Sequence, residues 1–403
     1  MSVVDVQPVA DTATAATDYV AIAREMRSRL QERAPWADRE RRLPEETVRE
    51  LIDTGMFTLT MPKSCGGAGM TMADYSDVQF ELGQGCLSTA WVQMIIGCVN
   101  HVAMISLGEE GRADVLGSVD DLRMCSVLAA KGSAKRVEGG WVVNGKWPSA
   151  SGSLHSSWGM VGCLLQERDG YPAGVGSAFM PISDDNGIQI KETWFVTGMR
   201  GTGSNMIVAE DVFVPDHLMA LQSDIAEKEF WGPDTEPAER WEFAPQFGLA
   251  LMGPALGGAE ALFEGVAANM SKRGVAEFDF PRQVDSSVVL GQLGQARILL
   301  DSARLQTRRG IAALEETTLQ RPMTYNERAR CRADAGFAAS QVRAAMSAWL
   351  DIAGSAMFSE TAPLERIWRD LSVVTRHPML NTKLTNEILG RALSDQPNIT
   401  HFV

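Results

Sequence analysis

The spacing of hydrophobic and polar residues first predicts a long helical segment, over residues 18–122. Within it, Leu43–Gly55 has a proline near its start, acidic residues in its first turn and a glycine after its end, which is typical of a short helix. Two further helices are predicted over Met72–Gly85 and Ser88–Leu107. The last of these has almost no polar face, so we expect it to be a central, buried helix.

Residues 123–216 have a different pattern, in which short β-branched and aromatic runs alternate with turn residues. Gly139-Gly140 and Asn144-Gly145 bracket one such run, as in a β-hairpin. The pattern predicts a β domain of the sandwich or barrel type. Residues 217–246 then read as an irregular connector, and connectors of that length often form lids or pocket walls.

Helical spacing returns over residues 247–403. Val288–Ala313 and Asn326–Gly354 are each long enough to be helices of a bundle. A later helix begins at Thr361-Ala-Pro363 and is broken at His377-Pro378, because proline lacks the N–H donor and clashes with the preceding turn. The whole chain therefore predicts an α+β fold, helical at both ends. Residues 1–17 read as a flexible tail.

Composition and charge narrow the class of protein. With 45% hydrophobic and 22% charged residues in 403, the chain is typical of a soluble globular protein of two or three domains. A net charge of −14 argues against nucleic acid or anionic membrane as a partner. No run approaches the ~18 consecutive apolar residues of a membrane span.

The cysteines and the N-terminus indicate the compartment. Six cysteines are scattered without a CxxC pair, so we expect reduced thiols and neither a disulfide nor a metal site. The first residues lack a basic start and an apolar core, so they do not read as a signal peptide. Together these features predict a cytoplasmic protein.

The segment Gly198–Asn205 is the first candidate for binding chemistry. It is too rich in glycine and hydroxyl residues for a packed strand, so we expect a tight loop whose amides and hydroxyls can contact a polar ligand. A tight connection between strands has a similar composition, and that alternative remains open. Ile207–Pro215, which follows, reads as a strand.

Three segments in order resemble the acyl-CoA dehydrogenase superfamily: Leu43–Gly69, Asn144–Trp147 and Lys191–Pro215. The resemblance covers nearly the whole chain. It implies the fold of that superfamily, with an N-terminal helical domain, a central β-barrel or sandwich and a C-terminal four-helix bundle. It also implies a flavin site.

The C-terminal part departs from the dehydrogenases. In many of them an Arg-Asp pair is followed by Tyr-Glu-Gly-Thr, whose glutamate removes the substrate proton. Counting from Arg369-Asp370, the tyrosine position is His377 and the glutamate position is Pro378, which cannot accept a proton. Trp147–His155 and Arg200–Ser204 instead resemble a branch of the superfamily, the two-component flavin-dependent monooxygenases.

The branch implies a reaction and its partners. A separate NAD(P)H:flavin reductase would deliver reduced FMN or FAD, and O2 would react through a C4a-(hydro)peroxyflavin. The product would be a hydroxylated aromatic or polyketide-like compound, or an N-oxygenated amine, made by a homotetramer. The alternative is an acyl-CoA dehydrogenase with bound FAD and a relocated base, for which Glu387 is the nearby candidate. A flavin-fold scaffold without catalysis is a third reading.

The resemblance assigns roles to individual residues. His377 would manage a proton and Ser151 would face the reacting atoms; a histidine that only caps a helix end is the alternative. Five further residues would bind flavin with Ser151: Trp91, Trp147, Thr202, Ser204 and Arg273. For Arg273 the alternative is a surface charge.

Three residues would line the substrate pocket: Val99, His101 and His155. Members of the branch often carry a histidine where this chain has Val99. His101 lies two residues further along the helix, a rotation of about 200°, so it cannot simply replace that histidine. We therefore expect the substrate to differ from the phenol that is usual in this branch. As an alternative to a role in the pocket, His155 could be a histidine at a strand edge that is hydrogen-bonded to the backbone.

Overall fold

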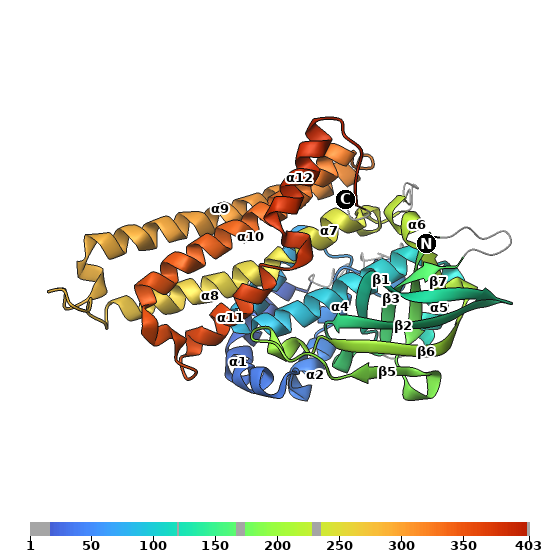
Figure 1. The fold of residues 1–403 in the computed structure, drawn as a ribbon, viewed down its shortest axis with the longest axis horizontal. Helices are drawn as coiled ribbons and strands as arrows, with labels where there is room; N and C mark the ends of the chain where they lie inside the picture. The colour runs from blue at the N-terminus through green and yellow to red at the C-terminus, as the bar shows by residue number, and fades with distance from the viewer. Residues whose placement is uncertain (1–16, 119–120, 167–173, 228–234, 401–403) are drawn as a thin grey trace, which may run out of the picture.

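The sheet lies at one side of the molecule, against helices from both ends of the chain (Figure 1). The computed structural model describes residues 17–118, 121–166, 174–227 and 235–400. The predicted tail over residues 1–17 therefore lies, except for residue 17, outside the described residues. The first helical segment contains five helices: α1 (Tyr19–Glu40), α2 (Glu45–Asp53), α3 (Met72–Gly85), α4 (Leu87–Ser106) and α5 (Glu109–Gly117).

Helix α4 is the predicted central helix, since every residue from Leu87 to Ile105 is buried. It packs against α3, the first strand of the sheet and the C-terminal helices. By length and composition alone α4 could cross a membrane, but its apolar window is wholly buried inside the protein. Packing in the protein core therefore accounts for its composition.

The β domain is one mixed sheet in the order β5-β6-β2-β1-β3-β4-β7, rather than two stacked sheets. Among the described strands, only β1 and β3 pair in parallel. β7 lies within the segment that was predicted to be an irregular connector, and it extends the sheet beside β4. The strands are β1 (Met124–Val137), β2 (Gly140–Ala150), β3 (Trp158–Leu165), β4 (Gly174–Pro181), β5 (Ile188–Lys191), β6 (Asn205–Pro215) and β7 (Met219–Leu221).

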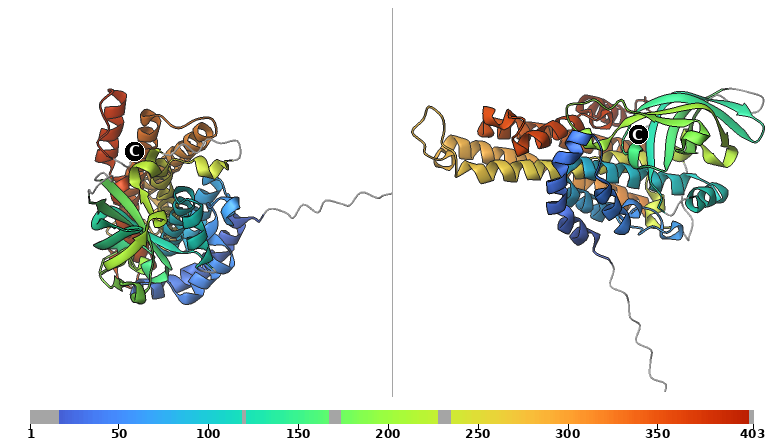
Figure 2. Two further views of the ribbon diagram at one scale, coloured as in Figure 1. Left: turned by 90° about the vertical axis from the view of Figure 1, so that its right-hand side faces the viewer. Right: turned by 90° about the horizontal axis from the view of Figure 1, so that it is seen from below.

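The C-terminal helices form an elongated body that extends away from the sheet, as Figures 1 and 2 show. α11 begins with a proline in its first turn and ends before Pro378, which starts a short 3-10 turn over Pro378–Leu380. The helices after the sheet are α6 (Gln222–Glu227), α7 (Phe243–Ala250), α8 (Met252–Met270), α9 (Ser287–Thr318), α10 (Tyr325–Ala353), α11 (Pro363–Val374) and α12 (Thr382–Leu393).

Candidate active site

A cavity of about 510 Å³ lies where α4, the sheet, α7 and the end of α11 meet. Its volume is within the range of small-molecule sites, about 300 to 1,000 Å³, and its walls are mostly apolar, as such sites usually are. The strands and helices that frame it are rigid elements, so its shape is largely preformed. Six residues that the sequence singled out line it: Trp91, Val99, Ser151, Thr202, Ser204 and His377.

The polar wall of the cavity is a chain of hydrogen-bonded hydroxyl groups, in which each hydroxyl donates to the next one along the chain. Thr202 Oγ1 donates to the carbonyl of Met199 at 2.8 Å. The single hydroxyl hydrogen of Thr202 is then used, so Ser204 must donate to Thr202 (2.7 Å). By the same reasoning Ser151 donates to Ser204 (2.8 Å) and accepts from Trp91 Nε1 (3.1 Å). Each hydroxyl keeps a free lone pair, so this wall offers acceptors to the cavity.

Two loops bring the hydroxyls together. Ser151 follows the end of β2, and Gly152, whose φ is +77°, turns the chain there. The N–H of Gly152 donates to the carbonyl of Thr202 at 2.9 Å, which joins this turn to the predicted loop over Gly198–Asn205. The loop is also tied to α11, because the buried carboxylate of Asp370 accepts from the Met199 N–H at 2.5 Å.

His377 stands opposite, just after α11. Its ring lies 5.6 Å from that of Trp91 and 6.3 Å from that of Phe247, centroid to centroid. Burial, and to a lesser extent the nearby charge of Arg332, lowers the pKa of His377 to about 4. Its Nδ1 accepts from the N–H of Met379 at 3.3 Å. His377 therefore caps the following turn and faces the cavity as well.

An aromatic wall was missed in the sequence. Trp194, Phe243 and Phe247 line the cavity, and the two phenylalanine rings stack 5.7 Å apart. Phe243 lies in the segment that was predicted to be a connector or pocket wall, and Trp194 precedes the predicted loop. Only the general tendency of long connectors to form pocket walls pointed to Phe243, and no prediction pointed to Trp194 or Phe247.

Trp147 does not line the cavity, contrary to its predicted flavin role. It is fully buried in the sheet, and its Nε1 donates to the carbonyl of Gly162 at 2.7 Å. Gly132 and Gly145 pair across β1 and β2, and a Cβ at either position would overlap the indole. The two glycines thus make a slot for Trp147 on the sheet.

His101 and His155 are also absent from the cavity wall. His101 is fully buried on the other side of α4, where its Nε2 donates to the carbonyl of Ala238 (3.0 Å) and its Nδ1 accepts from Gln246 (2.5 Å). His155 accepts from the backbone N–H of Leu43 at 3.2 Å, which is the alternative considered above. Burial lowers the pKa of both histidines to about 4, so both are neutral structural groups.

Arg273 lies away from the cavity as well. Its guanidinium donates to the carbonyl of Ala353 at 3.4 Å, beyond the end of α8. It is exposed there, as in the surface-charge alternative. Within one chain Arg273 therefore does not line the cavity, and its flavin role stays a prediction.

No carboxylate lines the cavity among the residues that the structure describes. Glu387, the candidate base of a dehydrogenase, is on α12, where it is exposed and pairs with Arg391 at 3.1 Å. The described part of the chain also has no group of three or more His, Cys, Asp or Glu residues that could hold a metal ion. The cavity therefore lacks the group that abstracts an α-proton in a dehydrogenase.

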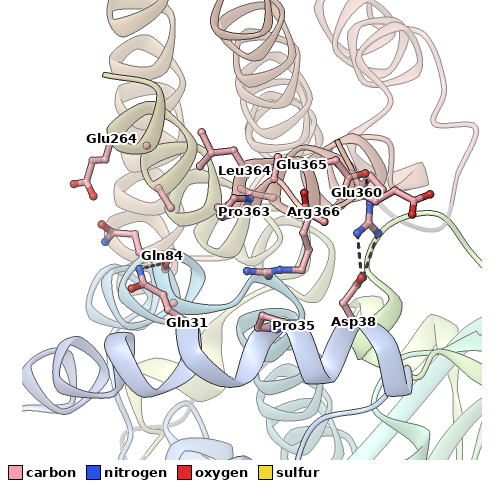
Figure 3. Close-up of a pocket in the computed structure, with 17 residues that line it drawn as sticks. Gln31, Pro35, Asp38, Gln84, Glu264, Glu360, Pro363, Leu364, Glu365 and Arg366 are labelled. Carbon is pink, nitrogen blue, oxygen red and sulfur yellow. Dashed lines mark hydrogen bonds and ion pairs between the residues drawn. The ribbon is translucent and has the colours of Figure 1, made fainter. Parts of the chain in front are cut away.

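A second hollow of about 700 Å³ lies between α1, α8 and α11 (Figure 3). Its cation Arg369 is already bound on both sides, by Asp38 at 3.0 Å and by Glu365 at 2.6 Å. Figure 3 labels Gln31, Glu264 and a second cation, Arg366, and no candidate site residue lines the hollow. The candidate residues line the cavity under α7, which therefore remains the candidate active site.

Comparison with known proteins agrees with this geometry. Residues 19–114 match the N-terminal domain of acyl-CoA dehydrogenases and residues 249–382 match the C-terminal domain. The oxygenase subunit HsaA, a flavin-dependent monooxygenase of Mycobacterium tuberculosis, is 31% identical over 347 residues, which cover 85% of this chain and 86% of the relative. The oxygenase component of the FADH2-dependent resorcinol hydroxylase of a Rhizobium species is 26% identical, with 88% of each chain covered.

A solved structure of XiaF from a Streptomyces species, in complex with FADH2 and glycerol, matches with a TM-score of 0.84 and 29% identity, over 95% of this chain and 99% of XiaF. A mostly apolar cavity with one hydroxyl wall and, among the described residues, no carboxylate is compatible with an oxygenase on a dehydrogenase scaffold. The chain belongs to the acyl-CoA dehydrogenase superfamily, among the oxygenase components of flavin-dependent monooxygenases.

The cavity fits a reduced flavin. A reduced isoalloxazine ring carries N–H donors, and the hydroxyl wall offers the acceptors that such donors need. Trp91, Ser151, Thr202 and Ser204 are the residues that would hold it. When bound, reduced flavin supplies the electrons that activate O2. The apolar walls exclude bulk water, so that activated oxygen is kept for the substrate.

Proposed function

We propose that this flavin-dependent monooxygenase hydroxylates a carbon atom of a flat, uncharged aromatic or polyketide-like compound. The observation that carries the proposal is the aromatic wall of Trp194, Phe243 and Phe247 in a cavity without a described carboxylate. Aromatic faces favour a planar ring, which gains about 0.5–1.5 kcal/mol per well-placed pair beyond burial. Val99 contributes a methyl surface to the cavity wall.

We propose FAD rather than FMN as the preferred flavin. A groove of about 620 Å³ adjoins the cavity and shares Val373 and Arg376 with it. Arg343 and Arg376 line this groove, and in the described part of the chain neither forms an ion pair with a carboxylate. The pKa of Arg343 is lowered by burial and then by the like charge of Arg376. Two adjacent cations without a carboxylate partner suit the pyrophosphate of a dinucleotide.

The partners follow from the oxygenase-component class. A separate NAD(P)H:flavin reductase would supply the reduced flavin, in the cytoplasm. We also propose a homotetramer. Helix α9 supports this proposal, because its apolar residues Ile298 and Leu305 are 68% and 69% exposed. Seven residues apart, these side chains share one side of the helix, as expected of a helix that packs against another copy.

Arg376→Met should weaken binding of reduced FAD about tenfold, the equivalent of about 1.4 kcal/mol for one charged contact. Reduced riboflavin, which has no phosphate, should bind the variant and the wild type equally. Anaerobic titration gives both affinities. Arg391→Met, on α12 and outside the groove, is the matched control. Equal wild-type affinities for FMN and FAD would overturn the preference for FAD.

The experiment that tests the function supplies reduced FAD from a flavin reductase under 18O2. Uncharged hydroxyarenes, aromatic carboxylates, amines and an acyl-CoA panel are offered separately, and products are identified by mass spectrometry. One 18O atom on a ring carbon of an uncharged arene is the expected result. Oxygen on nitrogen would show an N-oxygenase instead. Acyl-CoA oxidation without 18O, abolished by Glu387→Gln, would show a dehydrogenase.

A further inference from the structure

The hydrogen arrangement on the ring of His377 is set by the turn that follows it. Nδ1 accepts a hydrogen bond from the N–H of Met379 at 3.3 Å. A neutral imidazole has a single N–H, so when Nδ1 accepts, the hydrogen is on Nε2. Because His377 lines the cavity, Nε2 is the nitrogen left to face a bound molecule, and it faces it as a donor.

The same turn is held from the other side by Arg332 of α10. This arginine is only 5% exposed, and its guanidinium donates to the carbonyl of Met379 at 3.5 Å. One residue of the turn, Met379, is therefore bound at its N–H by the imidazole and at its carbonyl by the guanidinium. Burial lowers the pKa of Arg332 only to about 10, so it stays charged at neutral pH.

The described residues around His377 include no carboxylate that would stabilise a second proton. α4 and α7 present the uncharged rings of Trp91 and Phe247. α10 presents the cation Arg332, and the neighbouring residue on the histidine's own segment is another cation, Arg376. No described residue of the cavity wall is a carboxylate. An imidazolium here would be desolvated and would lie near the like charge of Arg332.

We propose that His377 acts as a neutral hydrogen-bond donor, through Nε2–H, to an oxygen atom in the cavity, and does not take a proton from the substrate there. Arg332 is the positioning residue that holds the imidazole in this form. The proposal rests on the monooxygenase function, and it replaces the general role of proton manager with a defined one. A neutral imidazole that polarises oxygen is an established device in catalysis.

Two substitutions of His377, by glutamine and by leucine, distinguish a hydrogen-bond donor from a base. The amide of His377→Gln can donate a hydrogen bond but does not titrate, whereas His377→Leu can do neither. We expect His377→Gln to keep the yield of product per reduced flavin within about fivefold of wild type, and His377→Leu to lose 100-fold or more, the usual effect of deleting one such donor. Equal losses in the two variants would contradict the donor role. His155→Gln, outside the cavity, is the matched control.

A spectroscopic measurement tests the tautomer without any turnover. In the flavin-free full-length protein with 15N-labelled histidine, two-bond 15N–1H correlations report the tautomer and charge of each of the five histidines. His377→Gln identifies the signal of His377. We expect a neutral Nε2–H form from pH 8 to pH 5. An Nδ1–H form or an imidazolium at pH 7 would overturn the proposal, whether or not a substrate has been found.

Removing the charge of Arg332 tests its positioning role. In Arg332→Met the signal of His377 should titrate closer to the ordinary pKa of about 6.5, and the pH profile of product yield should gain a step near pH 6. Arg332→Lys, which keeps the charge, should restore the wild-type titration. Arg330→Met, on the same helix and paired with Asp334, is the control. An unchanged titration in Arg332→Met would show that Arg332 has only a structural role.

Discussion

Ser151→Ala is expected to weaken binding of reduced flavin by about 10- to 100-fold, or about 1.4–2.7 kcal/mol. The hydroxyl of Ser151 accepts from Trp91 and donates to Ser204. Its removal leaves the buried indole N–H of Trp91 unpaired and allows Ser204 to rotate. The cavity then loses the acceptor of Ser151. The hydroxyl of Ser204 is also no longer held in one orientation. Anaerobic titration with reduced flavin gives the affinity.

Ser153→Ala is the control for this prediction. Ser153 is also buried, and it donates to the carbonyl of Gly203 at 3.1 Å in the same pair of loops, but it does not line the cavity. An equal loss of affinity in Ser153→Ala would mean that the loops, and not the hydroxyl chain, determine binding. Oxidised flavin offers fewer N–H donors, so its affinity should change less in Ser151→Ala.

Lowering the pH from 6.5 towards 4 should destabilise the folded protein by on the order of 3 kcal/mol per pH unit. The pKa values of His101, His155 and His377 fall to about 4 in the folded state, so in this range these histidines bind protons mainly when the chain unfolds. Burial raises the pKa of Asp370 to about 6, so it binds a proton mainly when folded. On unfolding, the three histidines bind about three protons and Asp370 releases about one. The unfolded chain therefore binds about two more protons than the folded protein.

The sign of this effect follows from the direction of each pKa shift. Lowered histidine pKa values give stability that is complete above about pH 6.5 and lost as the pH falls, while the raised pKa of Asp370 partly offsets the loss. Urea unfolding at pH 7, 6 and 5 measures the slope. His101→Gln should reduce the slope by one proton. A stability that is flat from pH 7 to 5 would show that these histidines are not neutral in the folded state.

The parts of the site with local sequence signals were predictable. A run of glycine and hydroxyl residues can only be a loop, and Thr202 and Ser204 of that run line the cavity. A proline after a helical stripe must end the helix, which placed His377 at a helix end. Val99 was singled out by the family resemblance, and helical periodicity turns His101 away from the cavity.

Trp147 and the aromatic wall were not predictable, because their positions depend on distant contacts. Side chains alternate along a strand, but the pairing of β2 with β6 shifts register between Trp147 and Ala150, so the residues after the shift are aimed differently. Phe243 and Phe247 are placed by α7, whose Gln246 is bonded to His101 on α4. Nothing local in either segment encodes that contact.

The two walls of the cavity have separate origins, and this affects how the enzyme can diversify. The hydroxyl wall is anchored in the sheet by the bond between Gly152 and Thr202, whereas the aromatic wall is carried by α7, at the end of a connecting segment. Substitutions at Phe243 or Phe247 can therefore reshape the space for substrate while the flavin-facing wall is conserved. Exchange of the α7 segment between relatives is thus a natural route to new substrates, with the oxygen chemistry inherited unchanged.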